Sequence, residues 1–467
     1  MVFSTVFFLF TYFPVVLFLH AVTPVRYRNA LLLVVNLIFY GWKKPVYIFI
    51  MFASIGIDYV HGLLVEKAKQ EGNDRRARRY VAQSVIFNLA LLGFFKYWDF
   101  IARSLSAVGL TFMPVLGLEL PIGISFYTFQ TMSYTIDVYR GDAKAQRNIV
   151  NFGTFVTLFP QLIAGPILKY KDLADQIDHR DYPVARFAAG VQIFVVGLAK
   201  KVLLANNIGA LWDIYKALPQ ERLTVTGAWL GVLCFALQLY FDFSGYSDMA
   251  VGLGRMLGFE FSGNFNYPYT ARSITDFWRR WHISLSSWFR EYLYFPLGGS
   301  RVSKGRLVFN LMVVWAATGI WHGANWNFLL WGVYYGLLLV LEKLVWGEAL
   351  KKLPAPIQHL YTLFVVAIGW TLFAIEDFSL LSPYLLAMFG RAGGGLADSA
   401  VFYYLRSYLP ILAIAIIGST PAVASAWHKL PQKAQKIACP VLLLAGLLLS
   451  TAYLVDGTYN PFLYFQF

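Results

Sequence analysis

The sequence predicts an all-α protein that crosses a membrane many times, and three observations support this prediction. The chain has 467 residues, of which 58% are hydrophobic and only 14% are charged, whereas about a quarter of the residues in a soluble domain are charged. Its mean hydropathy is +0.56. The apolar residues gather in runs of the length that a transmembrane helix needs, about 20 residues, and short basic loops separate these runs.

About eleven apolar runs are long enough to form transmembrane helices. They cover residues 4–21, 29–42, 45–65, 80–99, 187–205, 226–243, 307–321, 325–346, 357–375, 400–418 and 438–455. Three more apolar segments, 121–139, 149–168 and 246–259, contain glycine, proline or polar residues, so we expect short, tilted or re-entrant helices there. No basic stretch precedes the first run and no small-residue cleavage site follows it, so we expect the first helix to be retained.

The formal net charge of +14 indicates membrane topology and not binding to nucleic acid, because the basic residues fall in short loops. The loop 66–79 holds six Lys and Arg residues, so we expect it on the cytoplasmic side. We place the second basic block, residues 270–306, on the same side. The two cysteines, Cys234 and Cys439, each lie inside an apolar run, where we expect small core residues and not a disulfide.

The second basic block also carries an aromatic stripe. Its aromatic and aliphatic residues between 277 and 292 recur at helical spacing, which predicts one amphipathic helix whose apolar face contacts protein or lipid. Ser273 or Thr275 is suited to cap the start of this helix. Arg279, Arg280 and Arg290 lie in the same block and are suited to meet phosphate groups.

Two histidines are the strongest candidates for chemistry. His322 follows the apolar run 307–321, and His282 lies on the aromatic side of the predicted amphipathic helix. An ionisable side chain at membrane depth is costly unless it has a function or a partner, and a neutral imidazole can accept a proton from a hydroxyl near neutral pH. The alternatives are a core histidine bonded to a carbonyl for His322 and an interfacial anchor for His282.

Gly319 and Gly323 flank the pair Trp321–His322, and glycine lets a backbone turn or approach another closely. Asn325 follows as a possible orienting partner of the histidine.

Polar residues also interrupt the run around Tyr240 and Asp242. A carboxylate at membrane depth needs a partner or a water-filled site. Pairing with an arginine such as Arg255 is one interpretation of Asp242, and the polar wall of a substrate tunnel is the other. With the second interpretation, the predicted tunnel lining consists of Tyr240, Asp242, Asn266, Trp321 and Asn325.

Several motifs are missing from the sequence. It contains no P-loop, no dinucleotide-binding glycine pattern and no nucleophile elbow of the GxSxG type. His282 and His322 lack the spacing of a zinc-binding HExxH pair, so we predict no metal site.

Taken together, these residues resemble the membrane-bound O-acyltransferase family, and within it the bacterial branch of the alginate O-acetylation and teichoic-acid D-alanylation membrane proteins. The likeness covers about residues 1–375, and residues 120–330 form the core that bears its motifs. The stretches that carry it are Leu120–Tyr127, Ile163–Pro166, Gln238–Asp248, Asp276–Ser284, Leu297–Gly299 and Trp321–Gly323.

The resemblance implies a single integral membrane domain over residues 1–467, in which a ring of helices surrounds a central tunnel. The family's invariant histidine corresponds to His322, and its second polar position corresponds to His282, which would bind or polarise the donor carbonyl. The implied reaction passes an acetyl group from a cytoplasmic thioester across the bacterial inner membrane to an exopolysaccharide. Alginate is the first choice of acceptor, with cellulose or another cell-envelope polymer as the alternative.

The resemblance also implies partners. The donor would be acetyl-CoA or an acyl-phosphopantetheine carrier that acts as a substrate, with no bound cofactor. Periplasmic acetyltransferase proteins would complete the transfer to the polysaccharide. Two hypotheses from other classes remain open: a transporter that moves acyl groups or polymer without chemistry, whose helices are also broken, and a scaffold of the acetylation complex.

Overall fold

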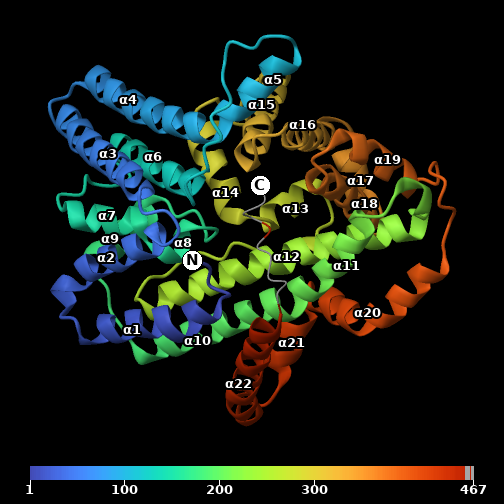
Figure 1. Cartoon of the computed structure of the whole chain (residues 1–467). Helices are drawn as coiled ribbons and strands as arrows, with labels where there is room; N and C mark the ends of the chain where they lie inside the picture. The colour runs from blue at the N-terminus through green and yellow to red at the C-terminus, as the bar shows by residue number, and fades with distance from the viewer. Residues whose placement is uncertain (458–462, 464–467) are drawn as a thin grey trace. The chain divides into compact units, whose positions relative to one another are not determined.

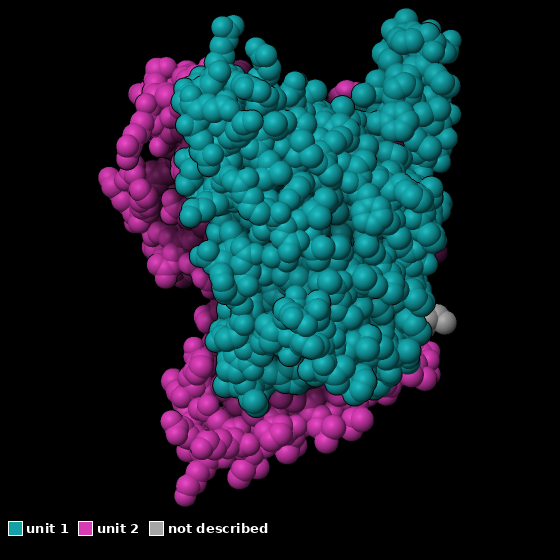
Figure 2. All heavy atoms as spheres, turned by 90° about the vertical axis from the view of Figure 1, so that its left-hand side faces the viewer, with its two compact units in different colours: residues 1–194, 249–262 teal, residues 195–248, 263–467 magenta. Residues whose placement is uncertain are grey.

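The structure, a computed structural model, describes residues 1–457 and residue 463. These residues form helices and no strand (Figure 1), as the sequence predicts. They divide into two compact units, each built from two separate stretches of the chain (Figure 2). Unit 1 comprises residues 1–194 and 249–262, and unit 2 comprises residues 195–248 and 263–467. That the chain behaves as a single domain stays a prediction.

Unit 1 is a group of helices with a buried carboxylate among them. Its helices are α1 (Phe13–Val22), α2 (Arg28–Gly41), α3 (Tyr47–Gln70), α4 (Asp74–Leu92), α5 (Trp98–Ala107), α6 (Ile124–Arg140), α7 (Ile149–Thr157), α8 (Phe159–Leu162), α9 (Tyr170–Asp178) and most of α10 (Val184–Ala199). Asp58 of α3 is fully buried and accepts hydrogen bonds from Ser84 Oγ at 2.5 Å and Asn88 Nδ2 at 2.8 Å, both on α4. These partners allow a carboxylate to lie at membrane depth.

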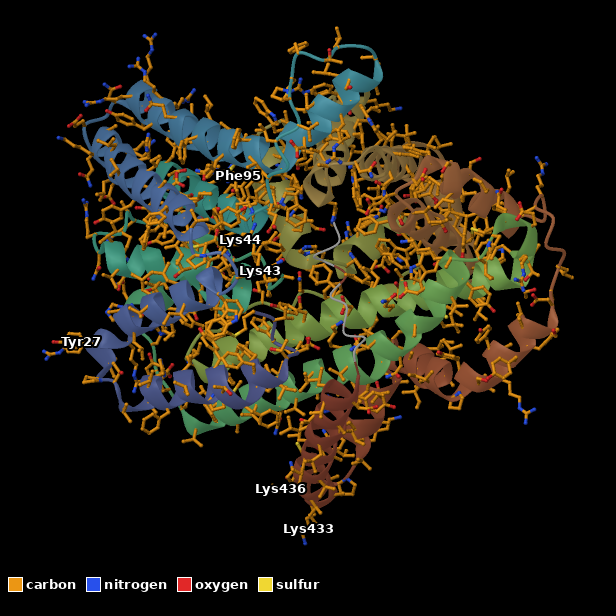
Figure 3. All side chains as sticks on the ribbon, in the orientation of Figure 1. Tyr27, Lys43, Lys44, Phe95, Lys433 and Lys436 are labelled. Carbon is orange, nitrogen blue, oxygen red and sulfur yellow. The ribbon has the colours of Figure 1, made fainter. Side chains whose placement is uncertain are left out.

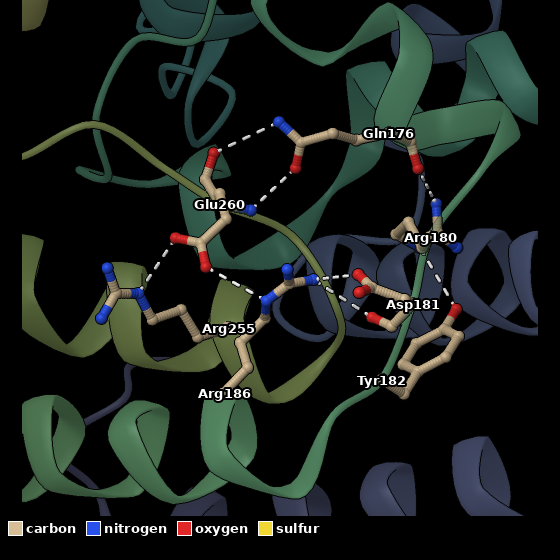
Figure 4. A network of polar contacts seen from close by, with 7 residues as sticks. All are labelled: Gln176, Arg180, Asp181, Tyr182, Arg186, Arg255 and Glu260. Atoms are coloured by element: carbon tan, nitrogen blue, oxygen red, sulfur yellow. Dashed lines mark hydrogen bonds and ion pairs between the residues drawn. The ribbon is translucent and has the colours of Figure 1, made fainter.

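A polar network fixes the chain that follows α12 within unit 1 (Figure 4). The side chain of Gln176 forms two hydrogen bonds with the backbone of Glu260. Its Oε1 accepts from Glu260 N at 2.7 Å, and its Nε2 donates to Glu260 O at 3.4 Å. The carboxylate of Glu260 pairs with Arg186 and with Arg255, each at 3.1 Å. Arg255 is therefore occupied by Glu260.

Unit 2 carries both candidate histidines. Its helices are α11 (Asn206–Lys216), most of α12 (Val225–Met256), α13 (Ile274–Arg280), α14 (Ile283–Phe289), α15 (Lys304–His322), α16 (Trp326–Leu341), α17 (Gly347–Lys352), α18 (Ala355–Ala374), α19 (Phe378–Met388), α20 (Ser399–Gly418), α21 (Ala422–Lys429) and α22 (Gln432–Asp456). A turn of π-helix over Lys200–Ala205 joins α10 to α11.

Among the described residues, eight helical segments are long and apolar enough to cross a membrane: Tyr47–Gln70, Asp74–Ala107, Val184–Lys216, Val225–Met256, Trp326–Lys352, Ala355–Ala374, Ser399–Gly418 and Gln432–Asp456. They match eight of the predicted runs. The runs 4–21, 29–42 and 307–321 are also helical, but the helices there are shorter or less apolar. The predicted number of eleven spans is therefore not confirmed.

The last of these segments is charged at one end. Lys433 and Lys436 lie near the beginning of α22 and are exposed (Figure 3). The stretch 437–455 is mostly apolar, and only 6% of the most apolar part of the helix is buried within the protein. Exposed apolar helices with a basic end are typical of lipid-facing spans whose basic end lies in the cytoplasm.

The prediction of a separate short, tilted or re-entrant helix over 246–259 is wrong, because α12 runs unbroken over 32 residues from Val225 to Met256. Gly245 does not turn the chain. A Cβ atom at this position would lie 2.7 Å from Gly197 O, so the glycine allows close packing between helices. The segment 149–168 is interrupted as predicted: α7 ends at Thr157, α8 covers only Phe159–Leu162, and the buried residues that follow are not helical.

Candidate functional site in unit 2

His322 is the last residue of α15, where α15 and α16 touch backbone to backbone. A Cβ atom on Gly319 would lie 2.3 Å from Phe328 O, and one on Gly332 would lie 2.4 Å from Trp315 O. Only glycine allows this approach. The close contact places His322 at the point where the chain turns from α15 into α16.

Aromatic rings surround the imidazole of His322. The rings of Trp321 and Trp331 lie 5.1 Å from it, and the ring of Phe373 on α18 lies 5.3 Å away. All three meet it edge to face, a favourable arrangement for aromatic rings. The side chain is nevertheless only half-buried, so part of it borders open space.

His282 lies in a break of the predicted amphipathic helix, and this corrects the prediction of one continuous helix over 277–292. The first part, α13, is capped by the hydroxyl of Ser273 and ends at Arg280, and α14 begins at Ile283. His282 has left-handed backbone angles, φ 43° and ψ 56°. Among the described residues other than glycine, only Tyr267 also has a positive φ. Such strained residues gather at functional sites.

The imidazole of His282 is almost completely buried, with 1% of the residue exposed. Its Nδ1 lies 3.3 Å from Oδ1 of Asn264, while its Nε2 has no hydrogen-bond partner among the described residues. Burial lowers the pKa of His282, which lies outside the eight candidate spans, to about 3. The imidazole is therefore neutral at physiological pH.

His282 and His322 line one cavity of about 340 Å³. The ring of Trp321 lies 6.1 Å from the ring of His282 and 5.1 Å from that of His322, so one indole contacts both histidines. Arg279 and Arg290 also line this cavity, together with small polar and aromatic side chains such as those of Ser286, Ser287, Thr318, Trp278 and Trp315. The cavity is large enough for one end of a small organic substrate, which could contact both imidazoles.

A second cavity of about 470 Å³ adjoins the first, because Thr275, Arg279, Leu311 and Leu339 line both. Its basic lining includes Arg272, Arg279, Lys343 and Lys351. Two of its acidic residues are occupied, since Asp276 pairs with Arg280 at 2.8 Å and Glu348 pairs with Lys351 at 2.6 Å. The basic side chains of Arg272, Arg279 and Lys343 are suited to attract an anion there.

Glu342, which lines the second cavity, binds the start of α13. Its buried carboxylate accepts hydrogen bonds from the first backbone N–H groups of α13, at Ile274 (2.8 Å) and Thr275 (2.9 Å). A carboxylate at a helix N-terminus satisfies free N–H groups and the helix dipole. It ties the end of α16 to the helix that leads to His282. The sequence alone does not point to Glu342, because its role depends on a contact with a residue 67 positions away in the chain.

The predicted tunnel residues are spread over unit 2. Asp242 pairs with Lys201 at 2.6 Å and not with Arg255, and the two side chains are only 3% and 1% exposed. Tyr240 is buried in a cluster of aromatic rings that includes Trp281. Asn266 is exposed and donates its backbone N–H to Arg280 O.

Asn325 donates to the carboxylate of Glu376 at 3.3 Å. None of Tyr240, Asp242, Asn266 and Asn325 is among the residues that line the two cavities, whereas Trp321 contacts both histidines. Of the three arginines predicted to bind phosphate, Arg279 and Arg290 line the cavity of the histidines, but Arg280 is held by Asp276. No group of three His, Cys, Asp or Glu side chains suited to a metal ion occurs within the described part of the chain.

Residues 142–375, which include both histidines and both cavities' lining, match the membrane-bound O-acyltransferase family, MBOAT. The chain belongs to this family, and it is an acyltransferase that crosses the membrane several times.

Relatives agree with this assignment over most of the chain. It is 40% identical to the probable alginate O-acetylase AlgI of Azotobacter vinelandii, over 100% of both proteins. It is 44% identical to the protein of the same name from Pseudomonas aeruginosa, over 83% of this chain and 75% of that one. It is also 32% identical to a peptidoglycan O-acetyltransferase of Helicobacter pylori, over 84% of this chain and 80% of that protein.

Proposed function

We propose that this protein transfers an acetyl group from a cytoplasmic thioester to a hydroxyl of an exopolysaccharide, or to a partner that passes it on to that polymer, with alginate as the first choice of acceptor. The cavity that His282 and His322 share is the observation that carries the proposal. The relatives named as probable alginate O-acetylases support the choice of acetyl group and of polymer.

His322 is the general base of this reaction. Its half-buried imidazole borders the cavity, so a hydroxyl group that enters there can reach it. As Nε2 or Nδ1 removes the hydroxyl proton, the oxygen attacks the carbonyl carbon of the thioester and a C–O bond forms. The C–S bond then breaks, the thiolate takes the proton, and the products are an acetyl ester and a free thiol.

The adjoining basic cavity is suited to the donor. Acetyl-CoA and an acyl-phosphopantetheine carrier both bring phosphate close to the thioester, and Arg272, Arg279 and Lys343 offer cationic side chains to it. Because Arg279 lines both cavities, a phosphate held in the second one leaves the acyl end free to extend toward the histidines. Arg290 adds a further positive charge to the cavity of the histidines.

The proposed location is the bacterial inner membrane, with the block 270–306 on the cytoplasmic side, where the donor is made. Basic residues in short loops favour this orientation. The acceptor lies across the membrane, and periplasmic acetyltransferase proteins are the proposed partners that handle the polymer.

The acetate content of the polymer tests this proposal. A strain that lacks the gene is complemented with the wild type or with His322→Ala, and the membrane content of each protein is measured alongside. We expect the wild type to restore polymer acetate and His322→Ala to leave it at the level of the deletion strain. Normal acetate with His322→Ala would refute the role of His322, while unchanged alginate and altered cellulose or peptidoglycan acetate would correct the acceptor. A transporter or a scaffold would tolerate the loss of His322.

A further inference from the structure

The turn at His282 is held by one residue from another part of unit 2, Asn264, through both its main chain and its side chain. The main-chain oxygen of Asn264 accepts from Ile283 N at 3.0 Å, and its side-chain Oδ1 accepts from Ser284 N at 3.1 Å. The residues on the C-terminal side of His282 are thus bonded to Asn264. These bonds offset the cost of left-handed backbone angles at a residue with a side chain.

The same bonds fix the orientation of the Asn264 amide. A backbone N–H group can only donate, so the atom that faces Ser284 N is the amide oxygen and not the nitrogen. The nitrogen Nδ2 faces the other way and donates to Ser247 Oγ at 3.0 Å.

The amide oxygen of Asn264 in turn determines where His282 carries its proton. This oxygen lies 3.3 Å from His282 Nδ1, and an amide oxygen can only accept. The hydroxyl of Ser284 donates to the same oxygen at 2.9 Å and lies 3.4 Å from Nδ1, so a lone pair of Ser284 Oγ faces the ring. Nδ1 therefore faces two acceptors, and the hydrogen of the neutral imidazole belongs on Nδ1.

We propose that Asn264 is a positioning residue that holds His282 as the Nδ1–H tautomer, so that Nε2 offers its lone pair to a hydrogen-bond donor of the substrate in the cavity. Nε2 is buried and has no partner among the described residues, and His282 lines the cavity that it shares with His322. A lone pair cannot donate a hydrogen bond to a carbonyl. His282 therefore accepts a hydrogen bond from a substrate O–H or N–H group and does not polarise the thioester. This inference about the substrate rests on the proposed function, whereas the tautomer does not.

Nuclear magnetic resonance of the protein in lipid nanodiscs tests the tautomer. Histidine labelled with ¹⁵N and ¹³C gives separate signals for protonated and unprotonated ring nitrogens, and His282→Asn identifies the signals of His282, because asparagine tolerates left-handed backbone angles. We expect a neutral ring with the proton on Nδ1 in the wild type. A proton on Nε2, or on both nitrogens at pH 7, would overturn the proposal.

Two substitutions at Asn264 distinguish a role in positioning His282 from a role in folding. Asn264→Asp keeps oxygen acceptors for Nδ1–H and Ser284 N, so we expect it to retain the Nδ1–H signal, whereas Asn264→Ala should shift the proton toward Nε2. If Asn264→Ala keeps the Nδ1–H tautomer, Asn264 does not hold it. Asn310→Ala, which removes another buried asparagine of unit 2 whose Nδ2 donates to Gly299 O, is the control and should leave the His282 signals unchanged.

Acetyl transfer from labelled acetyl-CoA, measured with the same variants in membrane vesicles, tests the consequence for the reaction. We expect Asn264→Ala to lower kcat about 10²-fold with little change in KM for the donor, since misplaced groups affect the chemical step, and Asn264→Asp to recover part of the rate. If the vesicles with wild-type protein transfer no acetyl group, the proposed function fails while the tautomer result stands. If Asn264→Ala shifts the tautomer but keeps the wild-type kcat, the role of the Nε2 lone pair is wrong.

Discussion

Unit 2 contains two buried polar centres that differ in how they are paired. Lys201 and Asp242 form an ion pair at 2.6 Å, Lys201 also donates to Asn206 at 2.8 Å, and Asp242 accepts the backbone N–H of Leu463 at 3.0 Å. His282 and His322 instead border a common cavity, and Nε2 of His282 has no partner within the described residues.

This difference distinguishes polar groups that support the fold from polar groups that can take part in chemistry. Both centres interrupt apolar sequence, and both are candidates for function on that ground alone. A buried ion pair is costly to break, because the loss of one partner leaves the other charge buried and unpaired, whereas an imidazole that borders open space can exchange a proton with a substrate.

Breaking the ion pair between Lys201 and Asp242 should lower the stability of the fold but not the rate of acetyl transfer by folded protein. We expect Asp242→Asn or Lys201→Met to lower the free energy of unfolding by about 3–5 kcal/mol, because each leaves an unpaired buried charge or polar group. The measurement is thermal unfolding in detergent, with acetyl transfer normalised to folded protein.

The double variant Lys201→Met/Asp242→Leu sharpens this test, since removing both charges should cost less than the sum of the single losses. The comparison between the two centres breaks if Asp242→Asn folds with wild-type stability but transfers no acetyl group.

Acid should destabilise the protein through His282. The folded-state pKa of about 3 lies below the ordinary value of 6.5, so the unfolded chain binds the proton first as the pH falls through that interval. Stability is then complete above pH 6.5 and decreases by about 2 kcal/mol between pH 6.5 and pH 5, at 1.36 kcal/mol for each pH unit. Unfolding temperatures of the wild type and of His282→Asn at these pH values measure the effect. Equal acid sensitivity in both proteins would show that another group is responsible.

The two neighbouring arginines of α13 allow a controlled test of the proposed donor site. Arg279 lines both cavities, while Arg280 is held by Asp276. We expect Arg279→Ala to raise KM for acetyl-CoA about tenfold, the loss of one charge-assisted hydrogen bond of about 1.4 kcal/mol. Arg280→Ala should change KM by about twofold or less. An equal effect of the two substitutions would mean that general positive charge, and not this cavity, attracts the donor.

The helical class and the membrane character can be predicted from the sequence, because apolar runs are local features. For the same reason the sequence singles out the two histidines as candidates, since ionisable residues within or beside such runs stand out. The continuity of α12 does not, since Gly245 is compatible with either a break or close packing, and only the proximity of Gly197 decides between them. The break at His282 cannot be predicted from the sequence either. The aromatic spacing of 277–292 is helical throughout, and the turn depends on hydrogen bonds to Asn264.

The partners of the polar residues also depend on contacts that are distant in the sequence. Pairing of Asp242 with an arginine such as Arg255 is one of the two interpretations that the sequence allows. In the structure Lys201, in the π-helical turn before α11, pairs with Asp242, and Arg255 pairs with Glu260. The sequence predicts the same role for Arg279, Arg280 and Arg290, but in the structure Arg279 and Arg290 line a cavity while Arg280 pairs with Asp276. The residue types were therefore predictable, while their assignment to a cavity required the fold.

The rate of acetyl transfer in membrane vesicles tests the central claim most directly, that the cavity of the two histidines performs the chemistry. Vesicles with equal amounts of wild-type protein or His322→Ala receive labelled acetyl-CoA, and label in the polymer is followed over time. We predict a rate about 10²–10⁴-fold lower for His322→Ala, at an unfolding temperature like that of the wild type. A wild-type rate in that variant would contradict the account.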